Sequence, residues 1–304
     1  MPARECYKHN LENPKQRGEG AHSYVMRMAN LARLAEISSQ QAFDDLRGVL
    51  DRRVRDNEIT TAIKKANNGT FTPRPRPAPV VRDGKAALQK IINQAKIKNE
   101  VDLWESSPIR LWEEPKDDAS LLLKILFKPD ELVFIGDRHD ADTIKTAAEW
   151  ITLFSNGGMT APFIIINSLS GIPAPAKSGD KTTLRGDANV TAFKYCMAEF
   201  DTISKEDQIK FWSAVKLPIV ALIDSGGKSI HAWINVQKMA KVETAEQWQS
   251  EIKNRLYDKI LIPLGVDAAC SNPSRLSRLP GHYRTEKQAW QKLLWLSPEG
   301  RSIC

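Results

Sequence analysis

An alternating run of prolines divides this chain into two parts. Residues 72–79 read Thr-Pro-Arg-Pro-Arg-Pro-Ala-Pro. Proline lacks a backbone N–H and has a fixed φ, so this run cannot join a helix or a central strand, and it favours an extended conformation. We therefore expect a Pro/Arg-rich linker over residues 71–84, an N-terminal domain over 1–70 and a second domain over 85–304.

The pattern before the linker is helical. Residues 21–34 carry an apolar side chain at every third position from Val25 onward, which indicates one face of a helix. Ser38 is a suitable N-cap for a second helix through Leu50, and Asp56 for a third. We expect a small bundle of three helices that forms an accessory domain.

Beyond the linker, short apolar runs alternate with capped helices. Capping-box patterns at Ser204 and Thr244 predict helices through Val215 and Leu256. This alternation predicts an α+β domain built around a mixed sheet. The expected strands cover residues 132–135, 163–166, 195–200, 219–223, 230–236 and 260–264.

Composition narrows the class of protein. A hydrophobic content of 41% is enough for a buried core, and no run approaches the roughly 20 apolar residues of a membrane span. The four cysteines include no Cys-x-x-Cys pair, so we expect reduced thiols rather than a zinc site. The net charge of +7 suits an anionic partner such as nucleic acid, although a merely soluble surface explains it equally well.

A first polar cluster closes the expected strand from Tyr195. Strand alternation places Glu199 and Asp201 on the same face. Paired carboxylates suit Mg²⁺ or Mn²⁺, which prefer oxygen ligands. A solvent-facing strand end is the alternative. We favour the metal because both carboxylates follow an apolar strand, where an unneutralised charge would be costly.

The second cluster, residues 225–231, reads Ser-Gly-Gly-Lys-Ser-Ile-His between two expected strands. The glycines allow a phosphate to approach the backbone, and Lys228 adds a positive charge. Ser229 and His231 share a face, which we expect to border a site or solvent. A Walker A loop is excluded because Leu222 stands where its first glycine would be.

The third cluster begins at Asp267 and continues into a loop bounded by prolines. Asp267 would add a third carboxylate to the metal site. Arg275 and Arg278 lie three residues apart, so both can reach the oxygens of one triphosphate. Surface salt bridges are the alternative explanation for these two arginines.

In their order and spacing, the three clusters resemble the archaeo-eukaryotic primase superfamily, especially primases and primer-polymerases of phages, plasmids and other mobile elements. Residues 198–201 match the hydrophobic-Asp/Glu-x-Asp motif, 229–231 match Ser-x-His, and 266–267 match hydrophobic-Asp. The segment 273–281 is similar to the one that follows the third motif. The resemblance covers roughly residues 100–300. Glu199 stands where many members have aspartate, which bears on metal preference.

The resemblance implies a catalytic domain with an RRM-like half and two divalent metals. Glu199, Asp201 and Asp267 would hold Mg²⁺ or Mn²⁺, and with His231 they form the expected catalytic set. His231 is more plausible as a phosphate contact than as a general base. The residues expected to hold the incoming nucleotide are Ser225, Lys228, Ser229, His231, Arg275 and Arg278.

We expect a DNA primase or primer-polymerase that acts on single-stranded DNA with dNTPs or NTPs. It would work in the cytoplasm of a bacterial or phage-infected cell, and any helicase partner would be a separate protein. A template strand needs cations and aromatic rings, and Lys177, Lys181, Arg185 and Trp233 are the candidates. A metal-dependent nuclease and a non-catalytic single-strand or origin-binding protein are the alternatives.

Overall fold

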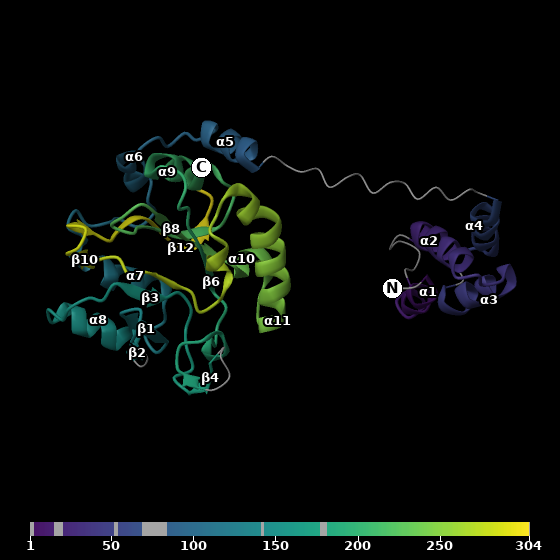
Figure 1. The fold of residues 1–304 in the computed structure, drawn as a ribbon, viewed down its shortest axis with the longest axis horizontal. Helices are drawn as coiled ribbons and strands as arrows, with labels where there is room; N and C mark the ends of the chain where they lie inside the picture. The colour runs from purple at the N-terminus through teal and green to yellow at the C-terminus, as the bar shows by residue number, and fades with distance from the viewer. Residues whose placement is uncertain are drawn as a thin grey trace. The chain divides into compact units, whose positions relative to one another are not determined.

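The chain divides into two units, Met1–Val81 and Arg82–Cys304, and each has a core of its own. This computed structural model describes residues 3–14, 21–51, 54–68, 84–140, 143–176 and 181–303. The expected linker over 71–84 lies outside the described residues except for Gly84, which begins a helix. Figure 1 shows the ribbon of both units.

The described part of the first unit consists of four helices around a small apolar core. Met28, Leu46 and Ile59 are fully buried at its centre. Ser38 caps the third helix by accepting from the backbone N–H of Gln41 at 3.2 Å, as the sequence predicts. The helices are α1 (Ala3–Leu11), α2 (Ala21–Leu34), α3 (Ser39–Val49) and α4 (Asp56–Asn68); α1 was not expected.

The second unit contains the remaining helices. Its α-helices are α5 (Gly84–Asn93), α6 (Glu100–Glu105), α7 (Asp118–Leu126), α8 (Ala147–Ser155), α9 (Lys205–Ala214), α10 (Gln237–Ala240) and α11 (Ala245–Gln247). A π-helical stretch, η3 (Trp248–Leu261), continues α11. Short 3-10 turns are η1 (Pro115–Asp117), η2 (Asp187–Asn189), η4 (Ile262–Leu264) and η5 (Ala268–Ser271). No helix in the described ranges is long and apolar enough to cross a membrane.

The strands of this unit form two four-stranded sheets and two short hairpins. The sheet orders are β12-β7-β8-β6 and β2-β1-β3-β9, and the hairpins are β4–β5 and β10–β11. The strands are β1 (Leu132–Gly136), β2 (Ile144–Thr146), β3 (Phe163–Ile165), β4 (Ala174–Pro175), β5 (Thr182–Thr183), β6 (Tyr195–Ala198), β7 (Ile219–Asp224), β8 (Ile230–Asn235), β9 (Leu276–Arg278), β10 (Tyr283–Arg284), β11 (Ala289–Trp290) and β12 (Lys292–Arg301).

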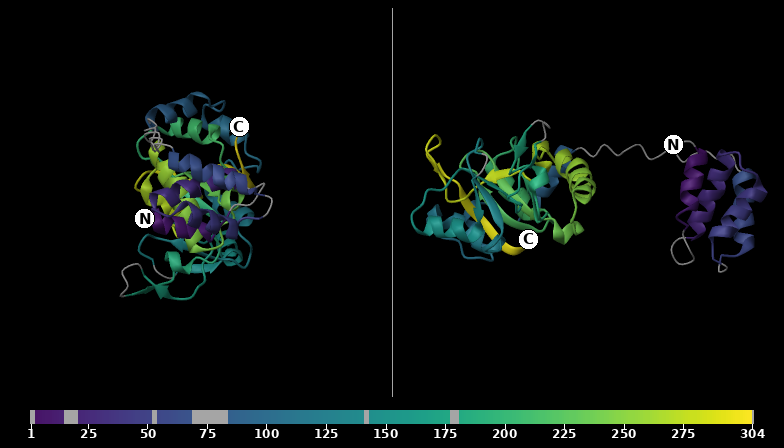
Figure 2. Two further views of the ribbon diagram at one scale, coloured as in Figure 1. Left: turned by 90° about the vertical axis from the view of Figure 1, so that its right-hand side faces the viewer. Right: turned by 90° about the horizontal axis from the view of Figure 1, so that it is seen from below.

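The α+β class is as expected, but the sheet is not mixed. Every pairing between strands in the described residues is antiparallel. Figures 1 and 2 show η3 along one side of the unit and α7 and α8 toward the other. Ser204 and Thr244 cap helices as predicted, with their side chains accepting from the backbone N–H groups of Asp207 and Gln247. The reciprocal bond of a capping box is present at Thr244.

The expected strand over 260–264 is wrong. Helix η3 continues to Leu261, five residues beyond the predicted end at Leu256, and η4 then follows through Leu264. An apolar run this short cannot by itself distinguish a strand from the buried face of a helix. Pro263 lies in the first turn of η4, which begins at Ile262, and Gly265 closes the turn with a φ of +100°. Asp267 therefore follows a helix rather than a strand.

The face of β8 that carries His231 and Trp233 was expected to border a site or solvent. Trp233 is instead fully buried and His231 is 5% exposed. Strand β9 of the other sheet covers this face, because Ser277 accepts a hydrogen bond from the Trp233 indole at 2.8 Å. A strand enclosed on both faces loses the solvent that its polar residues were predicted to meet.

Candidate active site

Two segments that are distant in sequence meet at the end of β6. The strand stops at Ala198, one residue before Glu199. The backbone N–H of Asp267 donates to the Glu199 carbonyl at 3.0 Å, and Asp267 begins the η5 turn by accepting from Ala269. This backbone contact sets the carboxylates of Glu199 and Asp267 side by side. Strand alternation, which was expected to pair Glu199 with Asp201, does not apply because β6 ends before both residues.

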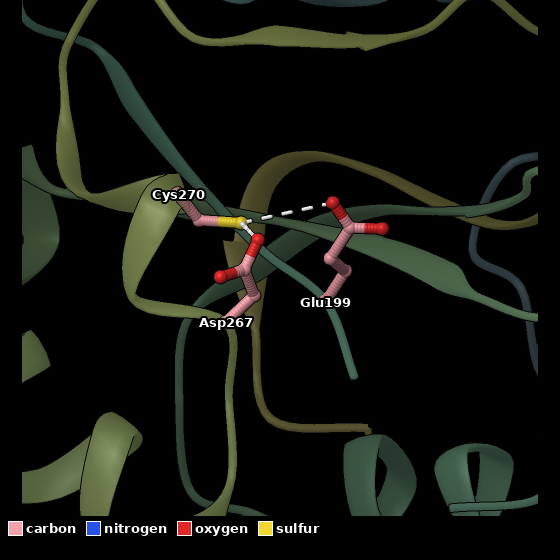
Figure 3. A group of neighbouring side chains, drawn as sticks. All are labelled: Glu199, Asp267 and Cys270. Atoms are coloured by element: carbon pink, nitrogen blue, oxygen red, sulfur yellow. Dashed lines mark hydrogen bonds between the residues drawn. The ribbon is translucent and has the colours of Figure 1, made fainter. Parts of the chain in front are cut away.

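Glu199, Asp267 and Cys270 form one acidic group. Each offers a ligand atom, and these atoms all lie within 4.8 Å of one another. Figure 3 shows the three side chains directed toward a common point, with the Cys270 Sγ 3.8 Å from Glu199 Oε1 and 4.0 Å from Asp267 Oδ2. Cys270 was not expected in this group, because a lone cysteine three residues after an aspartate has no recognisable pattern.

His231 contacts this group from β8. Its Nε2 lies 3.1 Å from Glu199 Oε2. Its Nδ1 accepts from the backbone N–H of Arg278 at 3.2 Å, and the Ser277 hydroxyl lies 3.1 Å away. Because a backbone N–H can only donate, Nδ1 is the acceptor and Nε2 carries a proton toward the carboxylate. The imidazole is therefore a fixed hydrogen-bond donor aimed into the site.

Arg275 balances the negative charge. Its Nη2 lies 3.8 Å from Glu199 Oε1 and 3.7 Å from Asp267 Oδ2. Burial alone would raise the pKa of Glu199, but hydrogen bonds from His231 and Ser229 and the charge of Arg275 outweigh burial and lower it to about 2. Glu199 is therefore a carboxylate at any physiological pH.

Asp201 stands apart from the acidic group. Its side chain is exposed, and Oδ1 accepts from the Ser229 hydroxyl at 3.2 Å. The Ser229 hydroxyl also helps to lower the pKa of Glu199, so it lies between the two carboxylates. Because a hydroxyl has one proton, it donates to one of them at a time. Among the described residues, the structure brings Glu199 and Asp267 together within ligand distance, and Asp201 borders that pair.

The turn between β7 and β8, residues 225–229, carries three of the expected nucleotide contacts, Ser225, Lys228 and Ser229. Ser225 N–H donates to the Ser229 carbonyl at 3.1 Å, which closes the turn. Lys228 is exposed. Arg284, which sequence reasoning missed, donates to the Ser225 carbonyl at 3.1 Å. Gln208 of α9 also holds the turn, because it accepts from Ile230 N–H and donates to the Lys228 carbonyl.

Arg278 is partly enclosed. Its guanidinium lies 4.4 Å from the centre of the Phe163 ring. Burial lowers its pKa, and the neighbouring charge of Arg284 acts in the same direction. Glu199 and Glu286 act in the opposite direction, so Arg278 lies among charges of both signs.

The template candidates have different environments. Lys181 is exposed, and Lys177 lies outside the described residues. Arg185 donates to the Arg138 carbonyl and lies over the Phe134 ring at 4.9 Å, so internal contacts hold it. Trp233 is in edge-to-face contact with Phe127 and has no exposed surface, so it cannot stack on a template base. We therefore correct that assignment.

The donor chemistry of the acidic group fits a hard divalent cation. Glu199 and Asp267 supply oxygen ligands, which Mg²⁺ and Mn²⁺ prefer. Burial raises the pKa of the Cys270 thiol to about 12, and the charge of Glu199 adds to this. The metal-free thiol is therefore uncharged, and the two carboxylates are the charged ligands of the group. Carboxylate oxygens suit Mg²⁺ or Mn²⁺.

Comparison with known proteins gives little. No family model matches the chain, and no curated protein matches its sequence. One solved structure that it resembles is the AEP domain of the primase-polymerase of cyanophage S-2L, with 18% identity and a TM-score of 0.37 over 62% of this chain and 93% of that one. A TM-score this low does not establish a shared fold, so the assignment depends on the site itself.

Proposed function

We propose that this protein is a metal-dependent, template-directed nucleotidyltransferase of the primase or primer-polymerase type. It would extend a strand on single-stranded DNA with dNTPs or NTPs and release pyrophosphate. One observation carries the proposal: Glu199 and Asp267 converge beside His231 and Arg275. The glycine turn of residues 225–229 borders the same place through Ser229. Phosphate and metal chemistry need these groups together.

The carboxylates would hold the metal. Glu199 and Asp267 are the ligands that already lie together, and we keep Asp201 as a third because Ser229 links it to Glu199. Bound Mg²⁺ or Mn²⁺ would activate a 3′-hydroxyl and neutralise charge on the pyrophosphate leaving group. The low pKa of Glu199 keeps that ligand ionised without the aid of a base.

The other residues would bind and position the triphosphate. Arg275 and Arg278 can make bidentate contacts to phosphate oxygens, and Lys228 adds an exposed positive charge. His231 would donate from Nε2, since the Arg278 backbone fixes its Nδ1 as an acceptor. This supports a role in phosphate binding rather than as a base. Ser225 and Ser229 would contribute hydroxyls from the turn.

The element order also supports the RRM-like part of the proposal. Strand β6, helix α9, strands β7 and β8, the α11–η3 helix and strand β12 follow one another as β-α-β-β-α-β. That is the order along the chain of ferredoxin-like units, with β9, β10 and β11 inserted before the last strand. The sheet differs from such a unit in one pairing, because β12 lies beside β7 and not beside β6. Glu199 and His231 both belong to the sheet formed by these strands or to its immediate end.

The direct test replaces Glu199 and Asp201 with alanine. Primer synthesis would be measured as labelled nucleotide incorporated on single-stranded DNA with Mg²⁺ or Mn²⁺. The proposal predicts that the double variant makes no detectable product while retaining the circular dichroism of the wild type. Undiminished synthesis would sink the metal assignment.

The same reaction separates the two alternatives. Incubating labelled DNA with metal but no nucleotides would produce fragments if the protein is a nuclease. A binding module would shift DNA without consuming nucleotide, and its nucleotide affinity, measured by calorimetry, would not depend on metal. The primase proposal predicts metal-dependent nucleotide binding and no cleavage. A helicase partner would enter as a separate protein that stimulates synthesis.

A further inference from the structure

The β10–β11 hairpin presents two exposed aromatic rings. Tyr283 is 42% exposed and Trp290 is 38% exposed. The two residues are cross-strand partners, and their rings lie 5.2 Å apart at an angle of 64°. Figures 1 and 2 show this hairpin at the edge of the second unit. Exposed large aromatic pairs of this kind need a reason, because burying them would be favourable.

The hairpin is held against the glycine turn. Gly226 has a φ of +64°, and a Cβ at that position would lie 3.1 Å from the Trp290 carbonyl oxygen. Only glycine accepts both conditions without strain. Arg284, the neighbour of Tyr283, donates to the Ser225 carbonyl. The aromatic pair is therefore positioned by the same turn that borders the acidic group.

The surroundings of the pair are basic. Lys228 in the turn and Lys287 in the hairpin are both exposed. Glu286 is the only carboxylate between residues 281 and 291, and Arg284 neutralises it at 2.7 Å. Burial lowers the pKa of His282, the residue before Tyr283, and the charges of Arg278 and Arg284 act in the same direction. Arginine charge therefore lies beside the aromatic pair.

Aromatic rings bordered by cations are typical of surfaces that bind single-stranded nucleic acid. Bases stack on the rings, and the cations follow the phosphates. We propose that Tyr283 and Trp290 form a stacking platform for a base of the single-stranded DNA substrate. The platform takes the role that the sequence had suggested for Trp233. The inference rests on the proposed function for its choice of substrate, but DNA binding can be measured without catalysis.

The first test measures binding alone. Affinity for a labelled single-stranded oligonucleotide would be followed by fluorescence anisotropy in EDTA without nucleotides. Because stacking contributes about 1–3 kcal/mol per base, Tyr283→Ala with Trp290→Ala should weaken binding about 5- to 150-fold. The matched control is Trp112→Ala, an exposed tryptophan in a pocket lined by Glu100 and Glu113, which should bind as the wild type does.

A second comparison separates stacking from damage to the hairpin. Trp290→Phe keeps a ring and should bind nearly as well as the wild type. An abasic oligonucleotide keeps the phosphates but offers no base to stack. The wild type should therefore prefer the normal strand, and the double alanine variant should show much less preference. Equal preference in both proteins would overturn the inference, as would double-variant affinity equal to that of the wild type.

The design keeps this inference distinct from the proposed function. Glu199→Gln should strongly reduce synthesis but leave DNA affinity unchanged, since the acidic group is not part of the platform. Wild-type synthesis with normal DNA binding by the double alanine variant would disprove the platform alone. Loss of binding by that variant, together with no synthesis by the wild type, would disprove the polymerase alone. If the wild type binds no single-stranded DNA, the inference fails.

Discussion

Two enclosed carboxylates of the second unit have opposite environments. Glu199, at the end of β6, receives hydrogen bonds from His231 and Ser229 and the charge of Arg275, and its pKa is lowered to about 2. Asp118, at the start of α7, is 2% exposed. Its Oδ2 accepts from the Leu293 N–H at 2.8 Å, but its Oδ1 has no hydrogen-bond partner in the described structure. Burial raises the pKa of Asp118 to about 7, although the hydrogen bond from Leu293 acts to lower it.

The comparison distinguishes a carboxylate that hydrogen-bond donors and a cation keep charged from one that is only buried. Burial acts on both groups in the same direction, against the charged form. Only at Glu199 do donors from β8 and a cation from the loop before β9 overcome it. A carboxylate that stays charged in an enclosed place can receive a divalent cation, whereas Asp118 is partly protonated near neutral pH. The convergent donors, rather than the burial, identify the functional group.

The largest expected difference between these two acids is in catalysis. Glu199→Gln should lower nucleotide incorporation about a thousandfold, because it removes a charged group that the transition state needs. Asp118→Asn should leave the rate near that of the wild type. Single-turnover incorporation on a primed single-stranded template measures both. Equal losses in the two variants would contradict a catalytic role that is specific to Glu199.

The next largest expected effect of Glu199 is on the stability of the fold at acid pH. The folded pKa of Glu199 lies below its ordinary value of 4.5, so its contribution to stability is complete above pH 4.5 and is lost as the pH falls toward 2. The contribution is about 3 kcal/mol at about 1.4 kcal/mol per unit of pKa. Urea unfolding at a series of pH values would measure it as the difference between the wild type and Glu199→Gln.

Tryptophan fluorescence is the appropriate probe for that measurement. All 8 tryptophans of the chain lie after residue 84, so the signal reports on the second unit alone. The free energies of unfolding of the two proteins should approach each other as the pH falls below 4.5. A constant difference across this range would mean that the charge of Glu199 is not stabilised in the fold.

Asp118 should show the reverse dependence on pH. Its folded pKa is raised from 3.8 to about 7, so its contribution to stability falls as the pH rises through that window. Asp118→Asn keeps an acceptor for the Leu293 N–H and removes the buried charge. At pH 8 it should raise the free energy of unfolding by about 2 kcal/mol, and at pH 4 it should have little effect. A loss of stability at pH 8 would refute this account.

The smallest expected effect is at the hydroxyl that links two carboxylates. Ser229→Ala removes the hydroxyl that donates to Asp201 and lowers the pKa of Glu199, which should cost about 1 kcal/mol of unfolding free energy. In the Glu199→Gln background the cost should be smaller, since a hydrogen bond to a neutral amide is weaker than one to a carboxylate. Additive effects in this double-mutant cycle would show that Ser229 does not act through Glu199.

Local features were predictable because neighbouring residues determine them. Ser38, Ser204 and Thr244 cap helices as expected, since a cap needs only a side-chain oxygen and the next turn of backbone. Strands β7 and β8 and the turn between them follow from apolar runs around Gly226-Gly227. The run at 260–264 was misassigned, because a short apolar segment suits a strand and a helix equally.

Residue type alone indicates which side chains could bind metal and phosphate, because Glu199, His231, Asp267 and Arg275 have the required chemistry. Which of them meet depends on the packing of the folded chain. The backbone contact between Asp267 and Glu199, at the end of β6, joins residues that are 68 positions apart in the sequence. The packing of β9 on β8 buries Trp233, and the β10–β11 hairpin brings Arg284 to the turn. Such contacts depend on how whole sheets and loops pack, and no local pattern of residues encodes them.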